Sequence, residues 1–397
     1  MRSVDEALDA ILSGVRPSGV ETLSLDRCVG RVLATFRITA AVDVPPFDNS
    51  SMDGFALRAA NAPGRLRLAG EIVAGSAVLP RVEAGAAVRI MTGAPMPPGA
   101  DSVAPLEVAD EADGAISVPP VELGAHVRRA GHDTRAGELV ELPAEPIGPP
   151  TLAVLASLGI GQVEVRRRPR VAIMSTGDEL RAPGEALEPG QIHDANSAAL
   201  AAAVDQAGGQ ALRLPLTPDD PGQIEQQVRA AVAVADLLVV SGGVSVGRHD
   251  HVRGVIERLG TLDFWRIRVQ PGKPLAYGAV DDMPVIGLPG NPVSALVTYE
   301  LFARPLIRRM LGLTGSGRLT LPAVARDRMT KDPERRAYLR VRVERGAGGL
   351  EAHSAGGQAS SQLRSLASAN ALLVVAEGEP AAEPGGTYDA LLLGEIG

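Results

Sequence analysis

Four polar loops carry the residue types best suited to hold an anion. They span residues 175–179, 241–250, 270–274 and 289–294, and each follows a short apolar run or an alternating one. The run at 237–240 has four branched apolar residues without alternation, which is typical of a strand buried on both faces. A polar loop at the end of such a strand is well placed to meet a ligand.

The second of these loops is rich in glycine. Gly242, Gly243 and Gly247 have no side chain, so backbone N–H groups there can approach a ligand closely. Asp250 is predicted to cap the helix that follows, because apolar residues recur after it at helical spacing. A helix N-terminus favours phosphate through its unpaired N–H groups and its dipole. The alternative is a simple tight connection, since the dinucleotide-binding and P-loop patterns are both absent.

Lysine is rare in this chain. Only Lys273 and Lys331 occur among the 39 basic residues. Lys273 lies in the third polar loop, Gln270-Pro271-Gly272-Lys273-Pro274, where a compact ammonium group suits a phosphate. The alternative is chance placement.

A repeat of strands and helices is predicted to position these loops. Apolar strand-like runs alternate with helical patterns between residues 171 and 288, including a helix at 197–207 capped by Asn196 and one begun by Pro221. This order is the signature of a doubly wound parallel sheet. Ligands bind at the carboxyl edge of such sheets. We therefore expect the four loops to share one pocket.

Local signals mark other helix boundaries. Ser3-Val4-Asp5-Glu6 is a capping box that opens the chain with an amphipathic helix. Asn291 and Pro292 are predicted to begin a long helix, which Pro305 should kink or divide.

Composition divides the rest of the chain. Short β-like runs cut by Pro and Gly lie on both sides of the α/β region. We predict an α/β and β multidomain protein with four domains: a discontinuous N-terminal helical and linker domain at 1–40 and 125–168, a β-rich insertion domain at 41–124, the doubly wound α/β domain at 169–314, and a small β-barrel domain at 315–397.

Charge and cysteine usage bound the class of protein. The 397-residue chain has a net charge of −8, which argues against a basic surface for nucleic acid. Its single cysteine, Cys28, excludes an internal disulfide and fits a reducing compartment. Neither a signal peptide nor a membrane-spanning run is evident. We expect a cytoplasmic protein that meets neither nucleic acid nor membrane.

Three further polar turns precede the α/β region, at 45–55, 90–101 and 128–133. Each alone is more often a solvated turn than a site. The basic run Arg166-Arg167-Arg168-Pro169-Arg170 is interpreted as a solvated linker, because the chain around it is acidic.

The order of the motifs resembles one known family. Six motifs carry the resemblance: PPFDNSSMDG at 45–54, MTGA at 91–94, STGDEL at 175–180, SGGVSVG at 241–247, PGKP at 271–274 and LPGNPVS at 288–294. Together with Leu339-Arg340-Val341 and Gln358-Ala359-Ser360-Ser361, they are similar to the molybdopterin molybdotransferase family, which includes bacterial MoeA and the gephyrin E domain.

The resemblance implies the last step of molybdenum-cofactor synthesis. In that family molybdate is inserted into adenylylated molybdopterin, and AMP is released as the phosphoanhydride is hydrolysed. The family is an elongated homodimer in which the insertion domain of one subunit faces the α/β domain of the other. A molybdopterin adenylyltransferase and downstream molybdoenzymes, or their chaperones, are the implied partners. The choice between molybdate and tungstate stays open.

The resemblance also implies the site residues. Catalytic roles fall to Asp53, Thr92, Asp133, Glu179, Asp250 and Lys273. Contacts to the pterin cofactor precursor fall to Ser175, Thr176, Gly177, Ser241, Gly242, Gly243, Ser245, Gly247, Pro271, Gly272, Pro289, Gly290, Asn291, Pro292 and Ser294. Asp53, Glu179 and Asp250 supply hard oxygen ligands suited to Mg²⁺. Either Asp219 or Asp220 matches a further family acid.

Departures and alternatives accompany this interpretation. His132 stands where the family usually has an acid, and Gln270 where lysine is common. His249 and His251 flank Asp250, but without a third ligand they do not indicate a zinc site. The rival functions are the preceding adenylylation of molybdopterin and a scaffold that uses the same fold to bind partner peptides.

Overall fold

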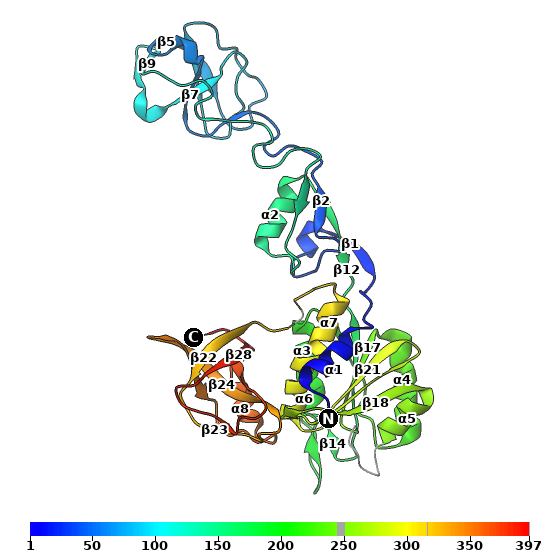
Figure 1. Cartoon of the computed structure of the whole chain (residues 1–397). Helices are drawn as coiled ribbons and strands as arrows, with labels where there is room; N and C mark the ends of the chain where they lie inside the picture. Colours follow the sequence, from blue (N-terminus) through cyan, green and yellow to red (C-terminus); the bar gives the residue numbers. More distant parts are fainter. Residues whose placement is uncertain (244–250, 316, 397) are drawn as a thin grey trace. The chain divides into compact units, whose positions relative to one another are not determined.

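The computed structural model describes residues 1–243, 251–315 and 317–396. The chain forms two compact units (Figure 1). The first comprises Met1–Glu21, Gly30–Ala34 and Val165–Gly397, and the second comprises Thr22–Val29 and Thr35–Glu164. The finer division into four domains stays a prediction.

A six-stranded sheet forms the centre of the first unit, in the order β16-β13-β17-β21-β20-β18. Its strands are β13 (Arg170–Ser175), β16 (Gln210–Arg213), β17 (Leu237–Ser241), β18 (Gly260–Arg266), β20 (Pro274–Val280) and β21 (Met283–Leu288). Strands β16, β13, β17 and β21 run parallel, as predicted. β20 is antiparallel to both of its neighbours. The tight turn at Asp281 and Asp282, both with positive φ, joins β20 to β21 as a hairpin and makes this edge of the sheet mixed.

Both faces of the sheet are covered by helices (Figure 1). Val171 and Ile173 of β13 pack into one core, while Ala172 and Met174 pack into the other, because alternate residues of a strand face opposite sides. The first core receives α1 (Val4–Leu12), α3 (Asn196–Gln206) and the helical segment that follows β21. The second receives α4 (Pro221–Val234) and α5 (His251–Leu259). The doubly wound α/β architecture is confirmed.

Pro305 divides the long helix, as predicted. The segment consists of α6 (Pro292–Thr298), a π-helical turn η4 (Tyr299–Ala303) and α7 (Arg304–Met310). Pro305 has no N–H to donate to the preceding turn. The N–H of Arg304 bonds the carbonyl of Tyr299 five residues earlier, which is the π-helical pattern.

A small closed β-barrel completes the first unit. Its strands are β22 (Thr320–Ala325), β24 (Arg336–Gly346), β25 (Gly349–Ser354), β26 (Ala371–Val375) and β28 (Thr387–Leu392). The order is β24-β25-β22-β28-β26, and pairing of β26 with β24 closes it, as predicted. The short β19 (Val269–Gln270) pairs with β24. β23 (Met329–Thr330), β27 (Ala381–Ala382) and α8 (Leu363–Ser368) complete this part.

The second unit is β-rich, as predicted. A six-stranded sheet has the order β7-β4-β6-β5-β9-β8. Its strands are β4 (Gly54–Leu57), β5 (Gly64–Ile72), β6 (Ala86–Ile90), β7 (Ser102–Pro105), β8 (Asp110–Ala112) and β9 (Ala115–Val118). Phe55 and Leu57 pack on one face of the sheet and Ala56 packs on the other, so β4 is buried on both sides.

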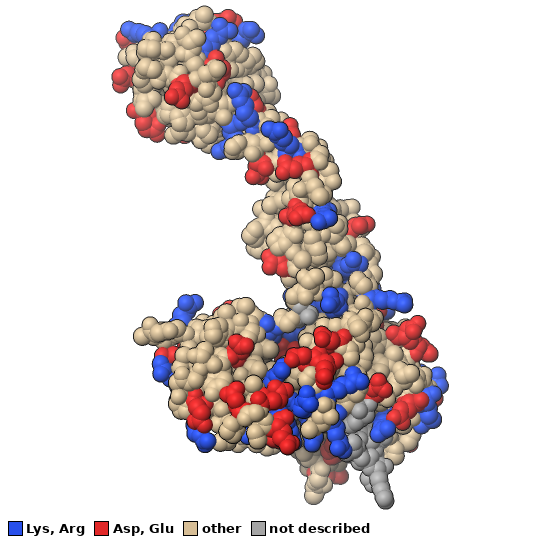
Figure 2. Space-filling view, in the orientation of Figure 1, with Lys and Arg blue, Asp and Glu red and all other residues tan. Residues whose placement is uncertain are grey.

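Shorter elements connect these parts. The two-stranded ladders pair β1 (Val20–Ser24) with β12 (Gln162–Arg166), β2 (Arg37–Thr39) with β11 (Leu139–Glu141), β3 (Asn49–Ser50) with β10 (Val127–Arg128), and β14 (Leu180–Arg181) with β15 (Ile192–His193). The remaining helical pieces are α2 (Pro149–Ser157), η1 (Leu25–Arg27), η2 (Ala59–Asn61) and η3 (Leu106–Val108). Acidic and basic side chains are interspersed over the face drawn in Figure 2. Within the described ranges, every helix is too short or too polar to cross a membrane.

Candidate active site

The register of the parallel strands brings three of the four polar loops together. Ser175 at the end of β13 pairs with Ser241 at the end of β17, and Ser241 pairs with Leu288 at the end of β21. The contact continues beyond the strands, because the N–H of Gly242 donates to the carbonyl of Leu288 at 3.3 Å. The loops therefore leave one edge of the sheet side by side, as the sequence predicted.

Two glycines allow these loops to pack closely. A Cβ on Gly177, whose φ is +153°, would lie 2.5 Å from a carboxylate oxygen of Glu179. A Cβ on Gly243, whose φ is +60°, would lie 2.5 Å from Val252 and 2.9 Å from the hydroxyl of Thr176. A side chain at either position would be strained in φ and blocked by its neighbours. The carboxylate of Glu179 is thus folded back over the loop that carries it.

A cavity of about 400 Å³ lies at this edge of the sheet. Four segments line it: the loops after β13, β17 and β21, and the segment that enters α3. The lining residues are Ser175, Thr176, Glu179, Leu180, Ile192, His193, Asp194, Ala195, Asn196, Ser241, Gly242, Gly290, Asn291 and Pro292. Eight of the predicted site residues therefore meet in one pocket.

Asn196 links two of the loops. Its side-chain amide donates to the hydroxyl of Ser241 and to the carbonyl of Gly290, both at 2.7 Å. The prediction that Asn196 caps α3 is wrong, because the carboxylate of Asp194 accepts from the N–H groups of Asn196 and Ser197 at 3.0 and 3.1 Å. The capping acid frees the asparagine to join the loops after β17 and β21.

Three buried polar atoms around this cavity lack a hydrogen-bond partner within the described structure. They are Oγ1 of Thr176, Oδ2 of Asp194 and Oδ1 of Asn196. An unsatisfied buried polar atom costs about 1–3 kcal/mol, so a group of three calls for an explanation. A site kept polar for a ligand is one that fits. Sequence reasoning missed Asp194, although the run Asp194-Ala195-Asn196-Ser197 has the residue types of a helix start.

The loop with Lys273 lies against α6. β18 runs in the same direction as β21, so its end faces the same edge of the sheet. A Cβ on Gly272, whose φ is +107°, would lie 2.3 Å from the methyl of Thr298 and 3.5 Å from the carbonyl of Ser294. Pro271 and Gly272 are buried and Lys273 is half-buried. Lys273 is not among the residues lining the cavity, so the structure brings its loop to α6 without placing the ammonium inside.

Two carboxylates, those of Asp178 and Asp219, gather beside Glu179. Partial burial, followed by the charges of Asp178 and Glu179, raises the pKa of Asp219. The N–H of Asp219 donates to Asp178 at 3.1 Å. Asp220 instead caps α4 by accepting from the N–H of Gln223 at 2.8 Å. The structure thus separates the two candidate acids: Asp219 faces the acidic group, whereas Asp220 serves the helix.

Asp53 and Thr92 form a pair within the second unit. One carboxylate oxygen of Asp53 accepts from the N–H of Thr92 at 2.6 Å and from its hydroxyl at 2.7 Å. These two bonds lower the pKa of Asp53. Asp133 belongs to the same unit and is exposed, with its N–H bonded to the carbonyl of Val44. The structure therefore joins Asp53 to Thr92 and holds Asp133 on a separate turn.

The remaining predicted residues fall into two groups. Pro289 and Ser294 lie on the loop after β21 and in the first turn of α6, outside the set that lines the cavity. Ser245, Gly247 and Asp250, together with His249, lie outside the described residues.

The barrel reaches the same edge of the sheet. The side-chain amide of Asn291 donates to the hydroxyl of Ser360 at 3.3 Å. Arg340 is buried and donates to the carbonyls of Gly357 and Ala359, which holds that loop in place. Gln270 accepts from the N–H of Asp332 at 2.9 Å. The motifs at 339–341 and 358–361 thus hold a barrel loop against Asn291, which lines the cavity.

Family models match the chain in the order of these structural parts. The MoeA N-terminal region, described as domains I and II, matches residues 2–159. A probable molybdopterin binding domain matches residues 172–309, which hold the cavity. The MoeA C-terminal region, described as domain IV, matches residues 322–393. The chain belongs to the MoeA family.

Relatives of the MoeA family resemble the chain over most of its length. Molybdopterin molybdenumtransferase 2 of Mycobacterium tuberculosis is 37% identical, with 95% of this chain and 96% of that protein covered. Molybdopterin molybdenumtransferase of Haemophilus influenzae is 38% identical, with 79% and 78% covered. A crystal structure of the molybdopterin biosynthesis moeA protein from Pyrococcus horikoshii is 27% identical, has a TM-score of 0.85, and covers 99% of this chain and 100% of its own.

Proposed function

We propose that this chain is a molybdopterin molybdenumtransferase, which inserts molybdate into adenylylated molybdopterin and releases AMP. The observation that carries the proposal is the cavity of about 400 Å³, because it gathers eight of the expected site residues within the region matched as a molybdopterin binding domain. The curated relatives that cover most of the chain bear this activity in their names.

The acids beside the cavity fit a Mg²⁺ ion that is shared with the substrate. Mg²⁺ usually binds through one or two carboxylates together with substrate phosphates. No group of three or more His, Cys, Asp or Glu side chains among the described residues is arranged to hold a metal alone. Asp178, Glu179 and Asp219 nonetheless bring like charges together, which raises the pKa of Asp219. A cation held by Glu179 and Asp219, with Asp250 as a further ligand, would relieve that repulsion and neutralise the phosphoanhydride charge.

The chain's own groups orient the substrate. The backbone amide of Gly243 acts as a fixed dipole toward phosphate oxygens. Lys273 adds a mobile positive charge from the loop beside α6. Water attacks phosphorus, the P–O bond of the anhydride breaks, and AMP leaves with one oxygen while the terminal phosphate stays on the pterin. The two thiol groups of the dithiolene bind molybdenum through sulfur, and their two protons leave with one oxide of molybdate as water.

The second unit also supplies site residues in this proposal, namely Asp53, Thr92 and Asp133. We place them in the site of the partner subunit of a homodimer, as the family resemblance implies. All three residues are polar and exposed, which supports such a role. Two hydrogen bonds from Thr92 also lower the pKa of Asp53, which favours its ionised form. A cytoplasmic location is part of the same proposal. So are supply by a molybdopterin adenylyltransferase and delivery to molybdoenzymes or their chaperones.

Incubation of the purified chain with adenylylated molybdopterin, Mg²⁺ and micromolar molybdate tests the proposal. AMP release that depends on molybdate, with reconstitution of an apo-molybdoenzyme, is the expected result. Consumption of ATP with release of pyrophosphate would instead assign the preceding adenylylation step. Tungstate in place of molybdate measures the preference between the two oxyanions.

Matched variants separate catalysis from a scaffold role. Glu179→Ala and Asp53→Ala should each reduce AMP release about 100-fold or more, the size expected for loss of an electrostatic catalytic group. Glu344→Ala, an exposed acid on the barrel, should leave the rate unchanged. If folded Glu179→Ala and Asp53→Ala proteins still support cofactor synthesis, the scaffold function becomes the better description.

A further inference from the structure

A second polar pocket lies at the opposite end of β13. It has a volume of about 470 Å³ and is lined by Glu21, Arg31, Arg167, Arg168, Arg170 and Gln210. Arg170 and Gln210 are the first residues of β13 and β16 and pair in register. β13 has six residues, so this arginine pocket and the candidate active site are separated by roughly 17 Å of strand. The basic run at 166–170, which was interpreted as a solvated linker, supplies three of the six lining residues.

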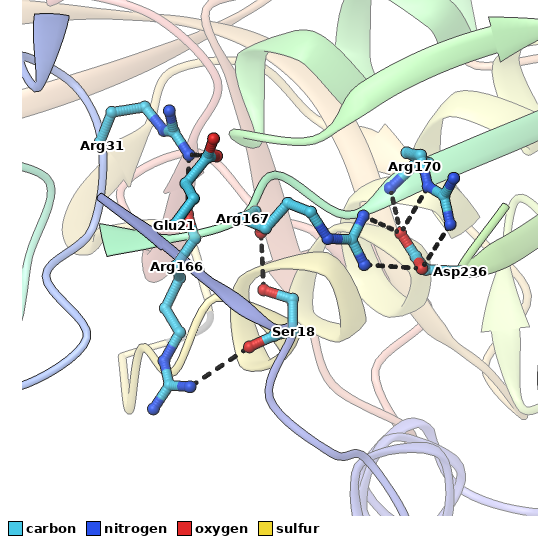
Figure 3. Close-up of polar contacts among 7 residues, drawn as sticks. All are labelled: Ser18, Glu21, Arg31, Arg166, Arg167, Arg170 and Asp236. Atoms are coloured by element: carbon cyan, nitrogen blue, oxygen red, sulfur yellow. Dashed lines mark hydrogen bonds and ion pairs between the residues drawn. The ribbon is translucent and has the colours of Figure 1, made fainter. Parts of the chain in front are cut away.

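Carboxylates and carbonyls fix two of the arginines (Figure 3). Arg167 makes a bidentate pair with Asp236, with distances of 2.9 and 3.0 Å. Arg31 pairs with Glu21 and donates to the carbonyl of Arg166 at 2.8 Å. An arginine has five N–H donors, so each of these groups keeps donors beyond those it uses.

The other two arginines are less engaged. Arg170 reaches Asp236 only at 3.4 Å with its guanidinium, although its backbone N–H donates to the same carboxylate at 2.7 Å. Arg168 is exposed and makes no hydrogen bond or ion pair within the described part of the chain. The side-chain amide of Gln210 is likewise exposed and uncommitted there. The pocket therefore presents free donors on a frame that other contacts hold in place.

The charge balance of the pocket is positive. Four guanidinium groups line it with one carboxylate, that of Glu21, and Asp236 supplies a second carboxylate to Arg167 and Arg170. Two positive charges remain uncompensated, on a chain whose net charge is −8. The lining has no aromatic side chain on which a base could stack. These features favour a small dianion over a nucleotide or a nucleic acid.

We propose that the arginine pocket binds a tetrahedral dianionic oxyanion, distinct from the substrate held in the candidate active site. Planar guanidinium groups match the oxygens of such anions through paired N–H donors. Phosphate and molybdate share this shape and charge. Arg168 and Gln210 are the residues that gain contacts when the anion binds, while Arg167 stays on Asp236. Glu21 and Arg31 lie on the two N-terminal segments of the first unit, so an anion here ties those segments to β13.

Titration calorimetry on the full chain tests this inference, with phosphate, sulfate and molybdate each added at constant ionic strength. Wild-type protein should bind one oxyanion that Arg168→Gln and Arg168→Gln/Gln210→Ala bind at least about tenfold more weakly. Neither variant removes a side-chain hydrogen bond or ion pair that the described residues make. Arg345→Gln removes another exposed arginine, on the barrel, whose side chain has no hydrogen bond or ion pair among the described residues, and it should bind as wild type. Lys273→Met should keep this site, which separates it from anion binding at the active edge.

The arms of the titration distinguish the sources of the anion. Equal binding of phosphate, sulfate and molybdate identifies a general oxyanion site, and a strong preference for molybdate identifies a second site for the metal oxyanion; either supports the inference. No saturable binding by wild-type protein at millimolar concentrations overturns it. Unchanged binding by Arg168→Gln, together with loss in Lys273→Met, also overturns it, because the anion then sits at the other edge.

Discussion

The pockets at the two ends of β13 are built in opposite ways. At the carboxyl end, glycines and short polar side chains line the cavity, and three buried polar atoms have no partner within the described structure. At the amino end, long arginine side chains line the pocket, and carboxylates hold Arg31 and Arg167 closely. The first arrangement leaves buried side-chain polar atoms that a ligand can satisfy, and the second uses ion pairs to position side chains.

The two ends of β13 therefore differ in whether their residues serve mainly ligand binding or mainly the stability of the fold. Unpaired buried polar groups reduce stability and are retained where a ligand satisfies them. Removing one partner of a partly buried carboxylate–guanidinium pair destabilises the fold, because it leaves an uncompensated charge. Changes at the carboxyl end should therefore act mainly on activity, and changes at the amino end mainly on folding.

Gly272→Ala is expected to have the largest effect and to change both properties. The added Cβ would lie 2.3 Å from the methyl of Thr298 at a φ of +107°. Thr298 is buried and its hydroxyl bonds the carbonyls of Ser294 and Ala295, so it cannot turn away freely. We expect a loss of about 3 kcal/mol in unfolding free energy, measured by urea denaturation. AMP release should fall as the Lys273 loop moves.

Gly254→Ala is the matched control. Gly254 lies within α5 and has open space around its Cβ position. Alanine there should stabilise the chain by up to about 1 kcal/mol. Equal destabilisation by both substitutions would mean that the packing of Gly272 against Thr298 is not the cause.

Asp236→Asn should have an intermediate effect, confined to folding. Burial alone would raise the pKa of Asp236, but hydrogen bonds from Arg167 and Arg170 outweigh it and lower the pKa from 3.8 to about 2. A depressed pKa stabilises the folded chain at a pH above about 3.8, and this contribution is lost as the pH falls toward 2. The variant should lose about 2 kcal/mol at neutral pH.

The pH profile of unfolding checks this origin. Between pH 4 and 2, wild-type stability should fall more steeply than that of Asp236→Asn, while AMP release at neutral pH stays near the wild-type rate. Asp9→Asn replaces an exposed acid on α1 and should follow the wild-type profile. Parallel profiles for wild type and Asp236→Asn would show that the arginines do not depend on this carboxylate.

Asp219→Asn should have the smallest effect on stability, and of opposite sign. Partial burial and the charges of Asp178 and Glu179 raise the pKa of Asp219. A raised pKa means that the ionised form of the carboxyl group destabilises the folded chain. This destabilisation is absent at a pH below about 3.8, the ordinary pKa, and is complete at a pH above the pKa in the folded chain. Removing the charge should stabilise the chain by about 0.5 kcal/mol at neutral pH, a small value because water screens these groups.

Binding of Mg²⁺ distinguishes the wild type from Asp219→Asn further. Mg²⁺ with AMP should raise the melting temperature of the wild type more than that of Asp219→Asn, and AMP release by the variant should fall. Asp220→Asn is the neighbouring control, since Asn can also cap α4. If Asp220→Asn loses activity and Asp219→Asn keeps it, the assignment of the family acid is reversed.

Local signals in the sequence predicted much of this structure. The capping box at Ser3 forms as expected, Pro221 begins α4, and Pro305 marks the division of the long helix. The apolar runs predicted strands, and their parallel register brought three of the polar loops together. These features depend on neighbouring residues, which is why they can be recognised in a single sequence.

Features that depend on distant partners were not predictable. Asn196 was interpreted as a cap because its type fits, yet its amide is used by Ser241 and Gly290, far along the chain. Arg167 belongs to a run that resembles a solvated linker, and only the fold brings Asp236 to it. Asp219 and Asp220 have identical chemistry, and only the hydrogen bond to Gln223 distinguishes them.

The pairing of β19 with β24 has a consequence for synthesis of the chain. Val269 and Gln270 pair with Arg336 and Ala337, and Gln270 also accepts from the N–H of Asp332. The loop with Lys273 begins immediately after this ladder. On a ribosome, residues 332–337 emerge long after the sheet strands that precede them. The active edge therefore acquires its final form only when the barrel has been made, so a chain interrupted before that point is released without a finished site.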